Sequence, residues 1–129
     1  MTLDELQGVL TDAGVTPVYL GQMPDTPDTA CALLEYGGRA PSYTFGTRGI
    51  DTEYPRLQVL CRGEANDYLA ARELAETAYA TLAAVANESI DSTHYQAVTP
   101  LQPPFLLKRD ERDRVYVAFN VEVAKAVSA

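Results

Sequence analysis

Apolar and polar residues alternate most regularly near the end of the chain. Within residues 114–124, every second side chain is apolar, namely Val115, Val117, Phe119, Val121 and Val123. Residues 55–62 repeat this pattern with Leu57, Val59 and Cys61. A period of two is typical of a strand with one buried face, so the pattern predicts strands over both segments.

Two other segments have helical periodicity. Residues 3–13 repeat leucine and valine at intervals of three and four, with Thr2 and Glu5 able to form a capping box and Gly14 marking the end. Residues 64–86 are rich in Ala, Leu, Glu and Arg and contain no Pro or Gly, and their apolar side chains form one broad stripe. The sequence therefore predicts a short amphipathic helix and a long helix whose alanines permit close approach to a sheet.

Shorter extended segments complete the predicted fold. Strands are expected over 17–20, 29–36 and 94–98, and residues 106–108 are expected to pair back on 114–124 as a hairpin. Residues 21–28 contain two Pro and two Asp and are expected to form a loop. The order predicts a single α+β domain over residues 1–129. Its mainly antiparallel sheet would have four to five strands, with two helices packed on one face.

Two long stretches, 37–54 and 99–114, are rich in Gly, Pro, Tyr and Arg. We expect both to be mainly loop. A domain of this size seldom retains loops of such length unless they contribute to function. Because no catalytic residues accompany them, the stretches favour a protein that acts through its surfaces, by assembling with other chains.

The charge of the chain narrows the classes of function. Its 129 residues, 47% of them hydrophobic, suffice for one folded core. The net charge of −8 repels nucleic-acid phosphate, so sequence-specific DNA or RNA binding is not expected. No apolar run approaches the roughly 18 residues that span a bilayer, and Asp4 and Glu5 argue against a secretory signal. We expect a protein of the cytoplasm, or of a particle built there.

Candidate catalytic and metal-binding residues are sparse. His94 is the only histidine, and it is expected at a surface or edge position without the partners that a nucleophilic site requires. Cys31 and Cys61 fall in predicted strands and are expected to be buried, reduced thiols. The acidic loop residues and turn glycines match no specific acid–base pair or phosphate-binding motif. We therefore expect no enzymatic activity, no cofactor and no metal.

Aromatic and basic residues are interleaved in the first long stretch. Tyr43 and Phe45 lie between Arg39 and Arg48, and Tyr and Arg are enriched at the energetic centres of protein interfaces. These residues either pack beneath the loop or contact a neighbouring subunit, whereas stacking on single-stranded nucleic acid is disfavoured by the net charge. A subunit-contact role makes all four candidate interface residues.

The second long stretch contains apolar residues followed by mixed charges. Phe105 begins an apolar turn, and Lys108 and Arg109 begin a run through Arg114 in which basic and acidic residues nearly cancel. Such a run is typical of a solvated turn with salt bridges, and a phosphate site is the alternative. Phe105, Lys108 and Arg109 are further candidate contacts to another subunit or to a tube.

Several segments together resemble a family of phage proteins. These segments are residues 18–28, 34–41, 54–59, 105–111 with Arg114, and 119–123. In order and spacing they are similar to the minor capsid or tail-terminator family of bacteriophages with long, non-contractile tails. The likeness covers most of residues 17–123, and the predicted helix at 64–86 occupies the place of that family's long helix.

The resemblance implies a small α+β subunit of a hexameric ring at the head-proximal end of the tail tube. Such a ring stops tube polymerisation, offers a docking face to the head–tail connector or stopper protein, and lets genome DNA pass through its lumen without specific binding. The chain would then belong to the tail or neck of a virion assembled in the host cytoplasm, and we expect residues 37–54 to reach a neighbouring ring, a neighbouring subunit or the lumen. A head-completion or neck subunit is the alternative within this class, and a small ligand-binding module is the alternative outside it.

Overall fold

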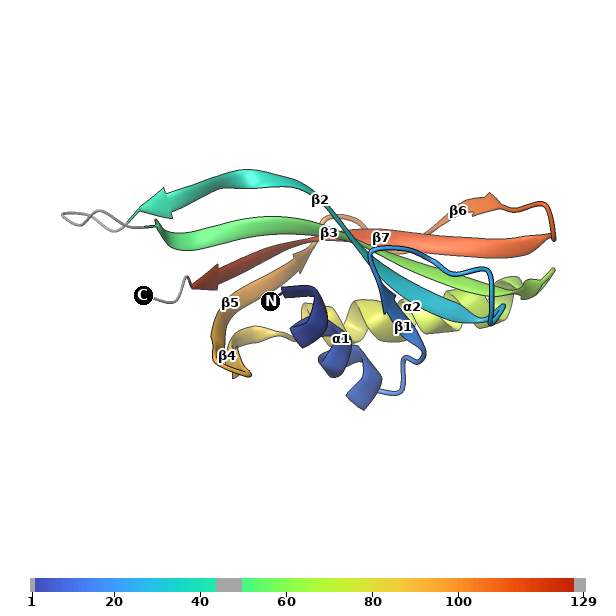
Figure 1. The fold of residues 1–129 in the computed structure, drawn as a ribbon, viewed down its shortest axis with the longest axis horizontal. Helices are drawn as coiled ribbons and strands as arrows, with labels where there is room; N and C mark the ends of the chain where they lie inside the picture. Colours follow the sequence, from blue (N-terminus) through green and yellow to red (C-terminus); the bar gives the residue numbers. More distant parts are fainter. Residues whose placement is uncertain (1, 44–49, 127–129) are drawn as a thin grey trace.

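The structure, a computed structural model, describes residues 2–43 and 50–126 and is elongated, with its longest strands along the longest axis (Figure 1). In these residues there are two helices and seven strands. They follow one another as α1 (Thr2–Asp12), β1 (Val18–Leu20), β2 (Ala30–Tyr43), β3 (Ile50–Ala65), α2 (Tyr68–Ala83), β4 (Ala86–Ile90), β5 (Thr93–Pro100), β6 (Phe105–Arg109) and β7 (Arg114–Ala126).

The strands form one mixed sheet in the order β1-β2-β3-β7-β5-β4, and β6 also pairs with β7. The β1–β2 pair is parallel, and every other pair is antiparallel. One edge of β7 pairs with β3, while its other edge pairs with β6 near the start of β7 and with β5 near its end. β7 is a central strand with partners along both edges, and its odd-numbered residues from Val115 to Val123 all face the main core, which explains the period of two.

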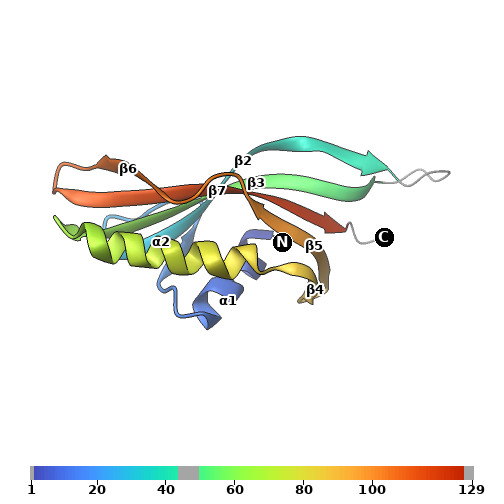
Figure 2. The same cartoon turned by 180° about the vertical axis from the view of Figure 1, so that it is seen from behind.

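Both helices lie on the same face of the sheet, as the view from behind shows for α2 (Figure 2). The main core fills the space between them and the sheet. It contains Leu6 and Leu10 of α1, the alanines of α2, and the odd-numbered residues of β7 from Val115 to Val123. Tyr79 of α2 packs edge-on against Phe119, with ring centroids 5.5 Å apart. The alanine stripe therefore permits close packing, as the sequence indicated.

A second, smaller apolar cluster lies on the opposite face of the sheet. Leu60, Tyr116 and Ala118 are buried there, and Met23, Leu34 and Phe105 pack against them. Met23 comes from the 21–28 loop and Phe105 from β6, so these two segments cover a face that the helices do not reach. Without this cover, the apolar residues of β3 and β7 on this second face would be exposed to water.

The predicted sheet of four to five mainly antiparallel strands is wrong, because the structure has a seven-stranded mixed sheet. The stretch from 37 to 54 is largely strand, since β2 extends to Tyr43 and β3 begins at Ile50. This outer part of the hairpin projects beyond both helices (Figure 1). Residues 35–40 are exposed there, so the strand carries no alternation of buried and polar positions for sequence analysis to detect.

The strand β4 was also missed, because its first residue continues the alanine-rich pattern of α2. The helix ends at Ala83, and Asn87 adopts a positive φ of 51° that a helix cannot accommodate. At its other end the helix begins at Tyr68, where the Asp67 side chain caps it by accepting a hydrogen bond from the Ala70 amide. The hairpin expected between 106–108 and 114–124 is present as β6 and β7.

Candidate assembly surfaces

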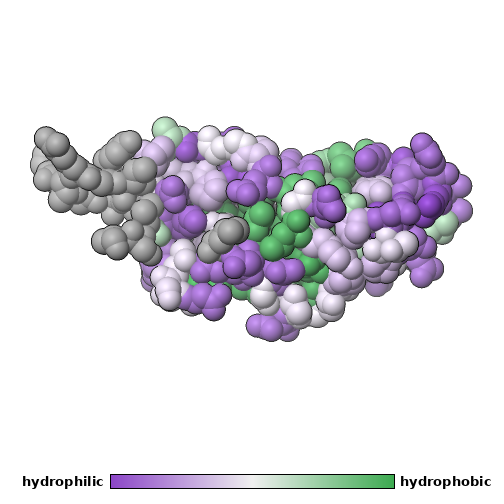
Figure 3. All heavy atoms as spheres, viewed as in Figure 1, coloured by the Kyte–Doolittle hydropathy of each residue, from purple (hydrophilic) through white to green (hydrophobic). Residues whose placement is uncertain are grey.

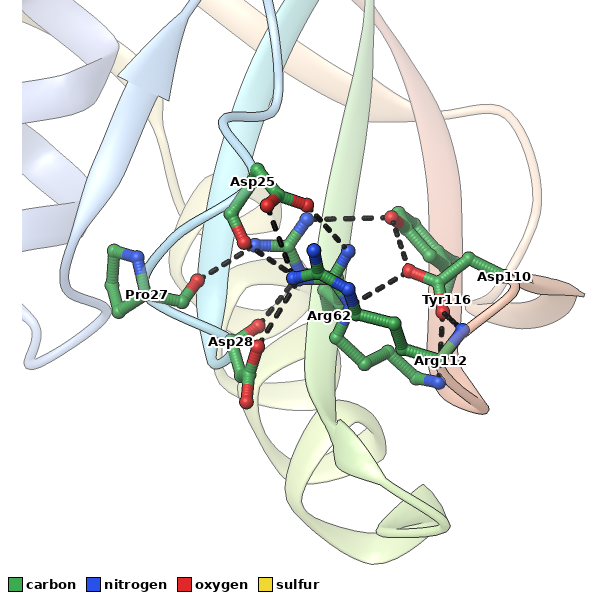
Figure 4. Close-up of polar contacts among 8 residues, drawn as sticks. Asp25, Pro27, Asp28, Arg62, Asp110, Arg112 and Tyr116 are labelled. Carbon is green, nitrogen blue, oxygen red and sulfur yellow. Dashed lines mark hydrogen bonds and ion pairs between the residues drawn. The ribbon is translucent and has the colours of Figure 1, made fainter.

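A buried arginine holds the 21–28 loop against the sheet face opposite the helices. Arg62 of β3 is 1% exposed, and its guanidinium donates hydrogen bonds to the carbonyl oxygens of Asp28 at 2.7 Å and Pro27 at 2.6 Å. A third bond, of 3.3 Å, reaches the hydroxyl of Tyr116, which is the register partner of Arg62 on β7 (Figure 4). The loop backbone is therefore attached to Arg62 of β3, which Tyr116 of β7 also contacts.

A second arginine extends the same network to the turn between β6 and β7. The Arg114 guanidinium donates to Asp110 Oδ2 at 2.7 Å, to Asp28 Oδ1 at 3.1 Å and to Asp25 Oδ1 at 3.1 Å. It also donates to the Asp25 carbonyl oxygen at 2.6 Å, and Arg112 pairs with Asp25 from the exposed side. Only 7% of the Arg114 side chain is exposed. A buried cation with several acceptors is stable only while its partners remain in place.

The carboxylate of Asp110 is the acidic centre of this network. Removal from water alone would raise its pKa, but hydrogen bonds from the Arg114 and Arg112 backbone amides, the Arg114 guanidinium and the Tyr116 hydroxyl outweigh that effect. They stabilise the ionised form and lower the pKa of Asp110 to about 2. The charged run at 108–114 is thus a turn with salt bridges, as one reading of the sequence expected, although Arg114 within it is buried.

These arginines have a structural role that sequence analysis did not identify. Arg62 lies on the polar face of the half-buried strand predicted at residues 55–62. Arg114 is the first residue of the strand predicted at residues 114–124. Most of their acceptors come from a loop that precedes both strands in the chain. Nothing in the local pattern around either arginine indicates such distant partners, and only the fold brings them together.

The outer part of the β2–β3 hairpin, residues 36–43 and 50–56, is here called the arm, and it joins the rest of the sheet through charged residues. Arg39 and Arg56 both place Nε near Glu122 Oε1 of β7, at 3.1 and 3.2 Å. The Arg39 guanidinium carbon lies 3.9 Å from the centre of the Tyr54 ring, a cation–π contact. Arg39, a predicted interface residue, is therefore engaged within its own chain, although 56% of its side chain remains exposed.

The other predicted interface residues of the first stretch give less information. Tyr43 is the last residue of β2, with its backbone paired to Ile50, and its side chain lies outside the described part. Phe45 and Arg48 lie outside the described residues altogether. Their proposed role at an interface stays a prediction.

The three predicted interface residues of the second stretch all lie on β6. Phe105 packs on the second apolar cluster, and the Lys108 ammonium lies 4.9 Å from the centre of the Tyr116 ring on that same face. Arg109 donates to Asn66 Oδ1 at 3.1 Å, next to the start of α2. This group is remote from Arg39. Arg39 contacts Glu122 of β7, whereas the pairing of β7 with β6 ends at Ala118, four residues earlier. Four residues of strand correspond to about 13 Å.

Among the described residues, the outer edges of β1, β4 and β6 and the part of β2 beyond Leu33 pair with no strand. The outer edge of β6 pairs with no strand, and Leu106 and Leu107 are 55% and 39% exposed on it. β1 pairs with β2 only from Cys31 to Leu33, which leaves the outer edge of β2 open from Leu34 onward. Exposed edges with unpaired amides and carbonyls readily add another strand, and proteins usually protect them. The β6 edge, with its exposed leucines, and the long β2 edge are therefore the main candidate assembly surfaces.

A hollow of about 380 Å³ at the base of the arm offers no clear chemistry. Its lining carries charges of both signs, from Glu35 and Glu53 and from Arg39 and Lys125, and contains no His or Cys. In residues 2–43 and 50–126, no group of three or more His, Cys, Asp or Glu side chains is placed to hold a metal ion.

On the face of the molecule drawn in Figure 3, hydrophilic residues cover the end where β6 turns into β7, and apolar residues gather near the middle.

An elongated mixed-sheet subunit with open edge strands fits a structural protein that assembles with other chains. The sequence model of the family described as "Bacteriophage tail terminator protein" matches residues 6–127, and the chain belongs to this family. Among solved structures, it is similar to a chain in a structure titled "Virion of native gene transfer agent (GTA) particle". That match has a TM-score of 0.63 and 12% sequence identity, covers 96% of this chain and 90% of the other, and concerns the fold. No curated protein sequence matches.

Family membership identifies the chain as a structural component of a phage virion, in its tail. The resemblance seen in the sequence is thereby confirmed at the level of the family. Within the described residues, neither helix is long and apolar enough to cross a membrane.

Proposed function

We propose that this protein forms a ring, most simply a hexamer, at the head-proximal end of the tail tube. The ring ends tube polymerisation and provides the surface to which the head–tail connector or stopper protein binds. The observation that carries this proposal is the family match over residues 6–127, to proteins described as tail terminators. A terminator must bind the last layer of the tube on one side and present a different surface on the other.

The open edges support a ring. A closed ring of identical subunits uses a heterologous contact, in which two different surface patches of neighbouring copies meet. The edges of β2 and β6 are two different patches on opposite sides of the sheet order. A protein that joined copies through one patch alone would stop at a dimer.

The charge of the chain supports passage of DNA through the ring. Six copies at −8 each would carry about −48, a field that disfavours adsorption of phosphate. Genome DNA would then move through the lumen without specific binding. The protein works by contact with chains of its own kind, with the tube protein and with the connector, and needs no cofactor for this.

The test is electron microscopy of tails assembled with and without this chain. Tubes of uncontrolled length that fail to join heads, in the absence of the chain, would support termination. Tubes of normal length with heads that leak DNA would instead favour a head-completion or neck subunit. Normal particles in both cases would contradict the proposal and would favour a small binding module.

A further inference from the structure

The direction of the strands distinguishes among the open edges. β2 pairs antiparallel with β3, β3 with β7, and β7 with β6, so β6 runs opposite to β2. β4 is antiparallel to β5, which is antiparallel to β7, so β4 runs in the same direction as β2. In a ring whose copies keep one orientation relative to the axis, β6 of one copy meets β2 of the next as an antiparallel pair. β4 would meet β2 as a parallel pair, which is less stable per residue.

The two edges also match face by face. On β2, Cys31 and Leu33 point into the helix-side core, so Glu35 lies on that side and Tyr36 on the other. On β6, Arg109 is paired with Val115, a residue of the helix-side core, whereas Lys108 is paired with Tyr116 of the opposite face. An antiparallel pairing that sets Glu35 opposite Arg109 therefore sets Tyr36 opposite Lys108.

Each of these pairs is chemically complementary. Glu35 and Arg109 are exposed and of opposite charge. Tyr36 is 43% exposed and Lys108 is exposed, so the ammonium and the ring can form a cation–π contact across the strands. A shallow hollow lined by Leu34, Tyr36, Gln58 and Asn120 lies on the same face as Tyr36, over β2, β3 and β7.

We propose that β6 of one copy adds to the outer edge of β2 of the next, at and beyond Leu34, with Glu35 facing Arg109. The occupant of each edge is thus a second copy of this chain, and the contact continues the sheet from subunit to subunit. Backbone hydrogen bonds supply affinity, and the side-chain pairs fix the register. This inference rests on the proposed ring and specifies its subunit contact.

A charge-exchange experiment tests the pairing. The full chain is assembled with the tube protein of the same phage, and capped tubes are counted by electron microscopy. Glu35→Arg and Arg109→Glu, made singly, each place like charges opposite one another in every interface, and each should lower ring formation at least about tenfold. In the double variant E35R/R109E, the new arginine of one copy faces the new glutamate of the next in every interface, because the contact is heterologous. This variant should recover most of the ring formation that each single variant loses.

The matched control is E88R/R109E. Glu88 is an exposed acid on β4, so this variant has the same composition and net charge as the double exchange but leaves Glu35 facing the carboxylate introduced by Arg109→Glu. It should remain as defective as Arg109→Glu alone. Thermal unfolding of each variant shows whether a defect comes from misfolding, and recovery by the double exchange cannot come from a misfolded chain.

The outcomes separate this inference from the proposed function. Wild-type rings that neither single variant weakens, or a double exchange no better than the singles, would overturn the β2–β6 contact and leave the ring intact. Recovery by E88R/R109E would also overturn it, because net charge alone would then explain the effect. Wild-type chain that neither forms rings nor shortens tubes would contradict the proposed function, and the inference with it.

Discussion

The guanidinium of Arg62 lies 2.6 Å from the carbonyl oxygen of Pro27, a residue 35 positions earlier in the chain. This bond and its neighbour to Asp28 hold the 21–28 loop over the second apolar cluster. Hydrogen bonds from a charged donor are stronger than neutral ones, and burial raises the cost of losing them. The loop therefore depends on Arg62 of β3 as well as on Arg114 of β7.

We expect Arg62→Met to lower the free energy of unfolding by about 3 kcal/mol, because two loop carbonyls and the Tyr116 hydroxyl lose a charged donor. Urea unfolding measures the change. The control is Arg112→Met, which removes an ion pair whose two side chains are 60% and 63% exposed, and it should cost less than about 1 kcal/mol. Equal effects of the two substitutions would contradict the role given to Arg62.

Stability should depend on the ionisation of Asp110 in acid. The pKa of Asp110 falls from an ordinary 3.8 to about 2 on folding. A group with a lowered pKa stabilises the folded state above its unfolded pKa, and this contribution is lost as the pH falls from about 4 toward 2. Urea unfolding between pH 5 and 2 should show a shallower decline for Asp110→Asn, which is already less stable at neutral pH. A decline as steep as that of the wild type would refute the assignment.

Gly38 is required where the arm meets the rest of the sheet. A Cβ on this residue would collide with the carbonyl oxygen of Tyr54 on the paired strand. We expect Gly38→Ala to cost about 1–3 kcal/mol and to speed amide hydrogen exchange in the arm. Gly37→Ala is the matched control, since a Cβ there meets no atom within 4 Å. Identical exchange rates in the two variants would argue against this close approach.

Helix α1 is attached to β5 through a buried tyrosine. The Tyr95 hydroxyl donates to Glu5 Oε1 at 2.6 Å, and Thr93 donates to the other oxygen at 2.9 Å. We expect Tyr95→Phe to lower the free energy of unfolding by about 1–3 kcal/mol, because the buried Glu5 carboxylate loses a donor. Tyr79→Phe keeps the ring that packs on Phe119 and should change stability by about 0.5 kcal/mol or less. A neutral Tyr95→Phe would show that the bond is not stabilising.

The two cysteines should be unreactive in the folded protein. Cys31 and Cys61 are fully buried register partners, with Sγ atoms 3.0 Å apart. The hydrogen bond with Cys31 and burial raise the pKa of Cys61 well above its usual value, so the reactive thiolate is disfavoured. A thiol reagent should label neither cysteine in buffer and both in urea. Rapid labelling in buffer would contradict the burial, and no labelling in urea would reveal a disulfide.

The sequence alone determined the elements whose pattern comes from a single buried face. The period of two in β7 and in the middle of β3, and the helical repeats of α1 and α2, identify these elements without knowledge of their partners. Sequence motifs in order also indicated the family, which the match over residues 6–127 confirms. Of the candidate interface residues, Phe105, Lys108 and Arg109 do share one strand, because they are close in the chain.

Tertiary structure alone decided the rest, because the determining contacts join residues far apart in the chain. The outer part of β2 is strand although residues 35–40 are exposed, since backbone pairing with β3 stabilises it. Arg62 and Arg114 are buried because a distant loop supplies their acceptors. The outer edge of β2 is open because β1 is short, and β6 has an open edge because it is the third strand that pairs with β7. Local periodicity in the sequence predicts neither arrangement.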